Sequence, residues 1–227
     1  FHRIWFRTAV RGIANVPSER VLLVANHSGQ IPLDGLVIGA AMFLDAEPPR
    51  ITRSMVEKWT QTLPFIGAAF QRLGQVVGVP ENARRLLESE ECVLVFPEGV
   101  RGISKPFRDR YQLTEFGHGF ARLALETQTP VVPVAVVGAE EQYISLGNMQ
   151  RVARLLSMPS LPLLPQLLVP GGFLPLPIRY RLRFGEPVLP TGEVDDESAV
   201  IGLTSRVRAD IEAMLERGVR ERRSWFY

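Results

Sequence analysis

Apolar runs alternate with longer amphipathic stretches along most of the chain. Continuous apolar runs of strand length lie at Val21–Ala25, Cys92–Phe96 and Val131–Val137, and residues 36–44 are apolar over a length that suits a buried helix. Strands that are apolar on both faces are typical of a parallel sheet covered by helices. The pattern therefore predicts an α/β fold, with a mainly parallel sheet flanked by helices on both faces.

Weaker signals fill the intervals between these runs. Residues 50–52 and 75–79 are predicted as short strands, separated by a helical stretch over residues 56–72 that Pro64 interrupts. The chain has no internal repeat and no Ser/Gly-rich linker. We therefore expect one domain spanning residues 1–227.

Three further elements complete this reading. Helices are predicted over residues 80–87, where proline takes the favoured first position, and over residues 116–124, where apolar side chains recur at helical spacing. Residues 180–184 alternate in the manner of a half-exposed edge strand. A final helix is predicted from one apolar face, which consists of Val200, Leu203, Val207, Ile211 and Met214.

The stretch at residues 155–178 carries no charge and matches a bilayer span in length alone. It contains six prolines and the pair Gly171-Gly172, so a lipid-exposed helix there would leave backbone groups unsatisfied. We predict an apolar, irregular excursion that either packs over the core or dips into a membrane surface.

Composition narrows the class of protein. With 227 residues, 46% hydrophobic and 22% charged, the chain is not of the disordered class, and a net charge of +2 gives no general case for nucleic acid binding. Lysine occurs only at Lys58 and Lys105, so 24 of the 26 basic residues are arginine. That bias reflects either genome composition or a need for planar guanidinium groups that bind phosphate or carboxylate.

Cysteine and histidine are scarce. Cys92 is the one cysteine and lies in an apolar run, which predicts a buried thiol, no internal disulfide and a reducing compartment such as the cytoplasm. No metal site is expected, because the spacing of these few residues fits no ligand pattern: His2, His27, Cys92 and His118.

Candidate chemistry follows the first strand. His27 stands at the carboxyl end of that strand, and Asp34 lies across a short loop that contains glycine and proline. An imidazole held by a carboxylate is a general base, since the carboxylate fixes the tautomer and stabilises the imidazolium. On this segment alone, two ordinary solvated side chains remain the alternative.

A second polar loop follows the run at Cys92–Phe96. Glu98 is expected to accept from a hydroxyl, Gly99 and Gly102 to allow close backbone approach to a ligand, and Arg101 to bind a phosphate or carboxylate. A surface turn with an ion pair is the simpler alternative. Ligands of open parallel sheets bind beyond the carboxyl ends of the strands, so the two loops are predicted to share one site.

These two segments resemble the conserved blocks of the glycerolipid acyltransferases, typified by 1-acyl-glycerol-3-phosphate acyltransferase. Residues 27–34 look like the catalytic His/Asp block, with six intervening residues where the family usually has four, a spacing similar to a bacterial subfamily called glycerol acyltransferase. Residues 96–101 look like the Phe-Pro-Glu-Gly-Thr-Arg block, with Val100 in the threonine position. The resemblance covers about residues 11–187.

Other segments match in part. Residues 63–67 and 132–136 are similar to the lead-in of the family's intermediate block and to its later proline-containing strand. Residues 74–79 lack the arginine that family members commonly carry there as a phosphate contact. Arg53, placed at the end of a predicted strand, is a candidate substitute.

The resemblance implies acyl transfer from an acyl-CoA or acyl-carrier-protein thioester to a glycerolipid hydroxyl, without any other cofactor. His27 would deprotonate the acceptor, with Asp34 as its partner. Lysophosphatidic acid, in phospholipid biosynthesis, is the expected acceptor, and an unphosphorylated alcohol such as diacylglycerol is the alternative. A thioesterase and a non-catalytic lipid-binding protein also remain open. The implied setting is the cytoplasmic face of a membrane, with no nucleic acid partner.

Overall fold

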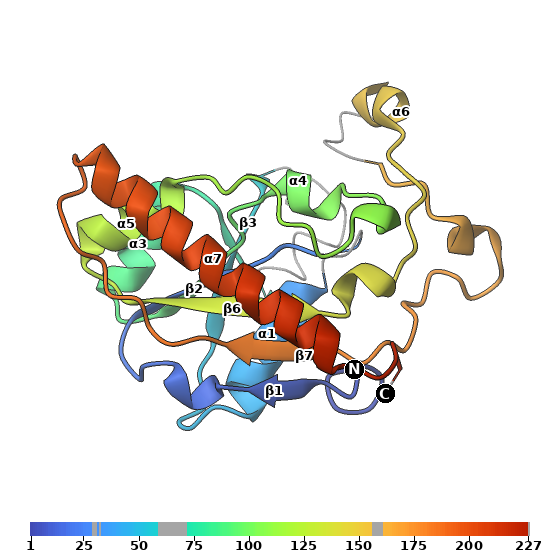
Figure 1. Ribbon diagram of the computed structural model, residues 1–227, viewed down its shortest axis with the longest axis horizontal. Helices are drawn as coiled ribbons and strands as arrows, with labels where there is room; N and C mark the ends of the chain where they lie inside the picture. The colour runs from blue at the N-terminus through green and yellow to red at the C-terminus, as the bar shows by residue number, and fades with distance from the viewer. Residues whose placement is uncertain (29–30, 32, 59–71, 156–160, 227) are drawn as a thin grey trace.

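The computed structural model describes residues 1–28, 31, 33–58, 72–155 and 161–226. Its strands are β1 (Ala9–Arg11), β2 (Val21–Ala25), β3 (Thr52–Val56), β4 (Val76–Val77), β5 (Cys92–Val95), β6 (Val131–Val137) and β7 (Arg181–Phe184). They form a seven-stranded sheet in the order β1-β7-β6-β2-β5-β3-β4 (Figure 1). The pairs from β6 through β2, β5 and β3 to β4 are all parallel. β7 runs antiparallel to β6, and β1 runs parallel to β7. The predicted mainly parallel sheet is confirmed.

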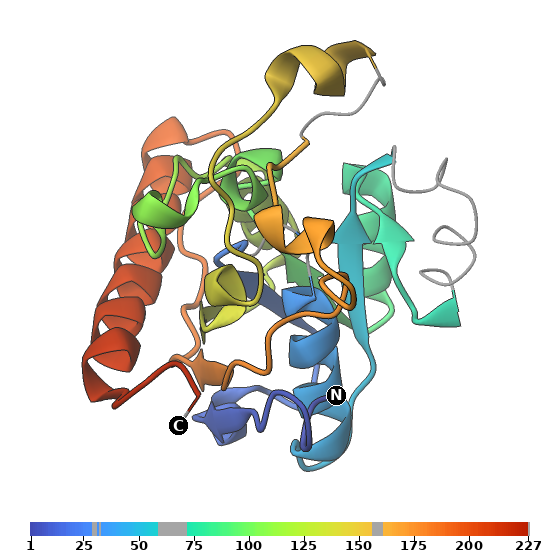
Figure 2. The same cartoon turned by 90° about the vertical axis from the view of Figure 1, so that its right-hand side faces the viewer.

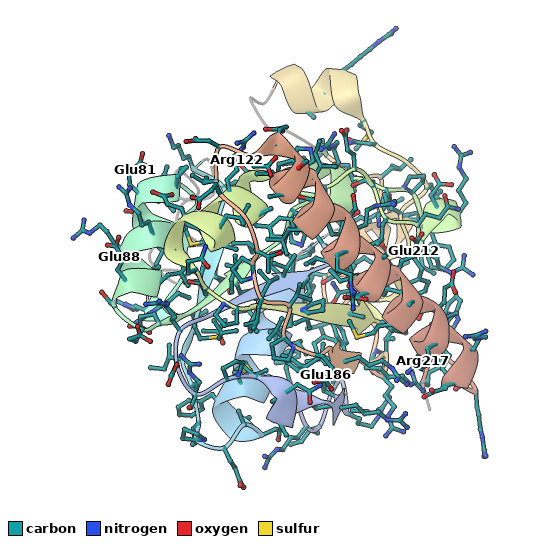
Figure 3. All side chains as sticks on the ribbon, turned by 60° about the vertical axis from the view of Figure 1, so that its left-hand side comes forward. Glu81, Glu88, Arg122, Glu186, Glu212 and Arg217 are labelled. Atoms are coloured by element: carbon teal, nitrogen blue, oxygen red, sulfur yellow. The ribbon has the colours of Figure 1, made fainter. Side chains whose placement is uncertain are left out.

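Helices cover both faces of this sheet, as predicted. The α-helices are α1 (Asp34–Leu44), α3 (Pro80–Glu88), α4 (Val100–Ile103), α5 (Gly119–Thr127), α6 (Gln150–Leu155) and α7 (Glu197–Glu221), and the 3-10 turns are η1 (Ile13–Asn15), η3 (Phe107–Asp109), η4 (Ala139–Glu141) and η5 (Pro165–Leu168). α3, α5 and α7 pack on one face, and α1 packs on the other with the N-terminal segment. α7 runs diagonally across its face of the sheet, as Figure 3 also shows.

The buried central strands explain why their sequences are apolar throughout. Every residue of β2 and β6 is buried. Leu22 and Val24 pack into the cluster under α7, whereas Leu23 and Ala25 pack into the cluster under α1. A strand covered on both sides needs apolar residues at successive positions, which is why the apolar runs in the sequence predict these strands correctly.

Three strand predictions need correction. Residues 180–184 do not form an edge strand, because β1 covers the outer side of β7 and becomes the edge itself. The strand predicted at residues 50–52 is β3, which begins at Thr52 and continues to Val56. The strand predicted at residues 75–79 is paired only at Val76–Val77. Most of the helix predicted over residues 56–72 lies outside the described residues.

The apolar excursion projects from the body of the molecule (Figures 1 and 2). We use this name for residues 146–177, since the segment leaves the core at Leu146, earlier than the sequence suggested. Two neighbouring stretches pair across the bridge between Asn148 and Pro162. No helix among the described residues has the length and apolar character needed to cross a membrane. The excursion exposes many apolar side chains: Leu146, Met149, Val152, Leu163, Leu167, Leu168, Val169, Phe173 and Leu174.

Gln142 ties the foot of the excursion to the body. Its side-chain Nε2 donates to the carbonyl oxygen of Ile31 at 2.8 Å, and its Oε1 accepts from the Tyr180 hydroxyl at 2.9 Å. Its main-chain oxygen accepts from the amide of Leu176, on the returning arm, at 3.0 Å. One buried residue therefore contacts the loop after His27, strand-flanking Tyr180 and the excursion.

Candidate active site

His27 and Asp34 meet at the carboxyl end of β2. Nδ1 of His27 lies 2.9 Å from Oδ2 of Asp34. Because an ionised carboxylate only accepts hydrogen bonds, the shared hydrogen belongs to Nδ1, and Nε2 keeps its lone pair. No described residue hydrogen-bonds to Nε2, and the His27 side chain is 14% exposed. The ring therefore offers a basic nitrogen to an incoming hydroxyl.

Asp34 is fixed by its position as the first residue of α1. The side chain is fully buried. Its Oδ2 also accepts from the Ser28 amide, and its Oδ1 accepts from the Gly35 amide, both at 2.9 Å. The positive end of the helix dipole favours a carboxylate at this place. The predicted folding back of the loop across its six intervening residues is therefore found, although residues 29, 30 and 32 lie outside the described part.

Glu98 is buried behind His27 and is 2% exposed. Its Oε1 accepts from the main-chain amide of His27 at 3.0 Å. Its Oε2 accepts from the amide and the hydroxyl of Thr114, at 2.7 and 2.9 Å. Both oxygens thus face donors of this chain, which corrects the expected contact with a substrate hydroxyl. Glu98 instead holds the backbone of His27.

Lys105 extends this buried network, a role that no motif in the sequence predicts. Its Nζ lies 3.7 Å from Oε2 of Glu98 and 2.8 Å from Oε1 of Glu140. It also donates to the carbonyl oxygen of Gln112 at 2.8 Å. Burial raises the pKa of Glu140, and the Lys105 charge opposes that rise. The sequence feature that could have drawn attention to Lys105 is its rarity, since it is one of two lysines in an arginine-rich chain.

Phe96 and Gly102 pack directly against His27. The Phe96 ring stacks on the imidazole, with centroids 4.2 Å apart and an interplanar angle of 23°. A Cβ added at Gly102 would lie 2.8 Å from both the Cβ and the carbonyl oxygen of His27. Gly99 begins this turn with φ 54°, a backbone conformation that favours glycine. Gly99 thus precedes α4, and Gly102 within α4 lies against His27. The close backbone approach expected at these glycines is therefore found next to His27.

Arg101 lies on the surface next to this contact. Its side chain is 57% exposed, and its guanidinium lies 2.9 Å from Oε2 of Glu115 and donates to the Glu115 carbonyl oxygen at 3.1 Å. The neighbouring residue Gly102 touches His27. The loop after β2 and the loop after β5 therefore do meet. The Arg101 guanidinium, however, is paired with Glu115.

Arg53 lies at the wrong end of its strand for the role proposed from sequence. It is the second residue of β3 and pairs in register with Val93, which pairs with Leu22. Its guanidinium lies 3.2 Å from Glu91. Leu22 is five residues before His27, so Arg53 sits about 16 Å back along the strand direction. The prediction failed because the strand continues beyond Thr52.

The arrangement of a histidine, a buried aspartate and the turn at residues 98–102 agrees with a match to a family of enzymes. A family model described as acyltransferase matches residues 7–137. The chain belongs to the acyltransferase family. The resemblance to glycerolipid acyltransferases that was read from its motifs is confirmed. Within the described ranges, no cluster of three or more His, Cys, Asp or Glu side chains is arranged to hold a metal ion.

Relatives of this acyltransferase occur in mycobacteria and vertebrates. An uncharacterized protein of Mycobacterium leprae is 39% identical over 100% of this chain, and one of Mycobacterium tuberculosis is 38% identical. This chain spans 64% and 66% of their lengths, just under two thirds. A Gallus gallus protein named "DGAT1/2-independent enzyme synthesizing storage lipids" is 25% identical over 94% of this chain and 60% of its own length.

A solved structure resembles the fold. It is the 1-acyl-sn-glycerophosphate (LPA) acyltransferase PlsC from Thermotoga maritima, which superposes with a TM-score of 0.63 over 96% of this chain and 73% of its own. The sequence identity is 21%, so the likeness speaks to the fold alone.

Proposed function

We propose that this acyltransferase moves a fatty acyl group from a CoA or acyl-carrier-protein thioester to a hydroxyl of a glycerolipid acceptor. The observation that carries the proposal is the 2.9 Å contact between Nδ1 of His27 and Asp34, which leaves Nε2 as a base. His27 is the catalytic residue, and Asp34 orients it. No cofactor besides the thioester co-substrate enters the reaction.

The proposed reaction needs one proton carrier. Nε2 of His27 takes the proton of the acceptor hydroxyl while the hydroxyl oxygen attacks the thioester carbonyl carbon. The tetrahedral intermediate then breaks its carbon–sulfur bond, and the departing thiolate takes the proton back from the imidazolium. The products are an ester and a free thiol. A positioned base of this kind contributes roughly 10²- to 10⁴-fold in rate.

We propose lysophosphatidic acid as the acceptor, with Arg101 as the phosphate contact. Arg101 and Glu115 form an exposed pair, and exposed pairs contribute only about 0–1 kcal/mol, so a phosphate can displace the carboxylate. The similar Thermotoga maritima enzyme is an LPA acyltransferase by its title. Diacylglycerol is the second candidate, favoured by the ion pair that already occupies Arg101 and by the storage lipids in the name of the Gallus gallus relative.

We further propose that the excursion docks this protein on the cytoplasmic face of a membrane. It exposes apolar side chains such as Leu168, 85% exposed, and Phe173, 69% exposed. The excursion carries two arginines and no acidic residue, which suits an anionic lipid surface. Vesicle sedimentation tests this step: Leu168→Asp with Phe173→Asp should lower the bound fraction, and binding equal to that of the unchanged protein would contradict the docking.

Replacing His27 tests the proposed reaction. We expect His27→Gln to abolish release of free thiol from acyl-CoA with acceptor present, while the unfolding curve stays close to that of the unchanged protein. His2→Gln is the matched control, because His2 forms another His–Asp pair, 2.9 Å from Asp45. Asp45 follows the last residue of α1, at the opposite end from Asp34. Full activity of His27→Gln would refute the base.

Product analysis separates the alternatives. Ester formation that equals thiol release supports a transferase, whereas thiol release without ester indicates a thioesterase. Retained lipid without any turnover indicates a lipid-binding protein.

The acceptor is tested with Arg101→Gln. A phosphate contact predicts a higher KM for lysophosphatidic acid and no change for diacylglycerol. Equal KM values for lysophosphatidic acid in the two proteins would remove Arg101 from the site.

A further inference from the structure

A pocket lined by arginines lies between the C-terminal end of α7 and the strands β1 and β7. Figure 1 shows where these elements lie in the fold. Its volume is about 380 Å³. The charged residues of the lining are five arginines and one acid: Arg11, Arg179, Arg181, Arg183, Arg223 and Glu221. The lining thus has a net formal charge of +4, in a chain whose total is +2.

The pocket is separate from the candidate active site. Leu182 and Phe184 of β7 pack into the cluster under α1, on the face that carries Asp34. Alternation along the strand therefore directs Arg181 and Arg183 to the opposite face, under α7. A Cβ added at Gly218 of α7 would lie 3.6 Å from the Arg183 side chain, which agrees with this placement.

The single acid does not neutralise the pocket. Oε2 of Glu221 is shared between Arg11, at 2.7 Å, and Arg183. Among the described residues, no carboxylate pairs with Arg179 or Arg223. The Nε of Arg179 is also buried without a hydrogen-bond partner there. A buried donor without a partner is costly, so an acceptor placed close to this nitrogen would stabilise the protein.

The arginines also crowd one another. Burial lowers the pKa of Arg181, and the charges of Arg179 and Arg222 lower it further, against smaller opposing effects of Tyr111 and Glu141. An ordinary solvated surface spreads like charges apart, whereas this pocket gathers five arginines around one hollow. An anion placed among them would relieve the repulsion and supply acceptors for Arg179 and Arg223.

We propose that this arginine pocket binds the phosphate group of an anionic ligand. A phosphate has several acceptor oxygens and close to two negative charges, which match planar forks converging from β1, β7 and the end of α7. The pocket is local and the chain is nearly neutral, which argues against an extended nucleic acid. The phosphate belongs either to a lipid headgroup or to a soluble molecule.

The position of the arginine pocket favours a lipid headgroup as the source of the phosphate. Arg181 pairs with Val137, the last residue of β6, so the pocket reaches the same edge of the sheet as His27. The C-terminus beside the pocket and the excursion lie on the same side of the molecule (Figures 1 and 2). A lipid surface touching the excursion would therefore find the pocket on the side that it approaches.

The first experiment titrates the whole chain with inorganic phosphate, at constant ionic strength set with chloride. We expect saturable binding and a higher Tm. The double variant Arg179→Gln with Arg223→Gln should weaken binding by at least about tenfold. The matched control removes two paired surface arginines, Arg84 and Arg122, by the same change. Arg122 lies toward the other end of α7 (Figure 3) and pairs with Glu197, and Arg84 pairs with Glu126.

Stability without phosphate distinguishes a binding site from a structural one. Removing two crowded charges should leave the Tm in phosphate-free chloride buffer unchanged or higher, while the response to phosphate is lost. A lower Tm there, or equal loss of phosphate binding in the control, would overturn the proposal. So would an absence of saturable binding in the unchanged protein.

Vesicles then identify the source of the phosphate. Vesicles of phosphatidylcholine, with and without phosphatidic acid, are sedimented with each protein. If the gain from phosphatidic acid is lost in the double variant alone, the ligand is a lipid headgroup. If inorganic phosphate binds and this gain is unaffected, the pocket serves a soluble phosphate compound. Acyl transfer to diacylglycerol in detergent should be equal in all three proteins, so the pocket can fail this test while the proposed reaction stands.

Discussion

Gly102 gives the sharpest test of how the candidate site is built. In the Gly102→Ala variant the new methyl group would lie 2.8 Å from the Cβ and the carbonyl oxygen of His27 and 3.0 Å from the Cβ of Glu98, whereas ordinary contacts begin at 3.4 Å. Either α4 or the backbone of His27 must therefore move by about 0.6 Å, since no flexible side-chain end is available to give way. The imidazole would shift against Asp34.

The cost follows from these contacts. Overpacking of this kind costs about 1–3 kcal/mol, and the better helix propensity of alanine offsets up to about 1 kcal/mol of it. A displacement of 1 Å costs about 10²-fold in rate, so we expect kcat/KM for acyl transfer to fall by about 10- to 100-fold. Thiol release from acyl-CoA and urea unfolding measure the two effects.

Gly202 supplies the control. It lies in α7 with open space where a Cβ would be, so Gly202→Ala should gain about 0.5–1 kcal/mol and keep full activity. If Gly102→Ala behaves like Gly202→Ala in both assays, the contact between Gly102 and His27 does not position the base.

Three further predictions concern single buried groups. Asp34→Asn should lower kcat by roughly 10²- to 10⁴-fold with little change in KM, because an amide can hold the wrong imidazole tautomer; initial rates that fall less than threefold would contradict this. Glu98→Gln should cost about 2–4 kcal/mol in urea unfolding, against about 0.5 kcal/mol or less for the exposed Glu115→Gln, and equal losses would contradict the network. Burial raises the pKa of Cys92 to about 11, so thiol reagents at pH 8 should label it only on unfolding; rapid labelling of the folded protein would refute this.

The fold was readable because its central strands are covered on both faces, which forces uninterrupted apolar runs such as Val131–Val137. The His27–Asp34 pair was readable because both residues stand where a strand ends and a helix begins. Both the strands and this pair can be predicted from residues that are close together in the sequence.

The errors came from information that is not local. Alternation in β7 looked like solvent exposure, whereas its arginines line a pocket and a three-residue strand covers the edge. An error of a few residues in the bounds of β3 placed Arg53 at the wrong end of the sheet. The partner of Glu98, Thr114, lies 16 residues along the chain, and no pattern near Glu98 announces it.

The Gln142 amide has a consequence for engineering. The side-chain amide joins the loop after His27 to the hydroxyl of Tyr180, and the main-chain oxygen of the same residue holds the returning arm at Leu176. The placement of the excursion relative to the loop after His27 therefore depends on hydrogen bonds made by this one residue. A chimera that receives the excursion of a relative should therefore keep Gln142 itself, because its side chain holds the loop after His27 and its backbone holds the grafted arm.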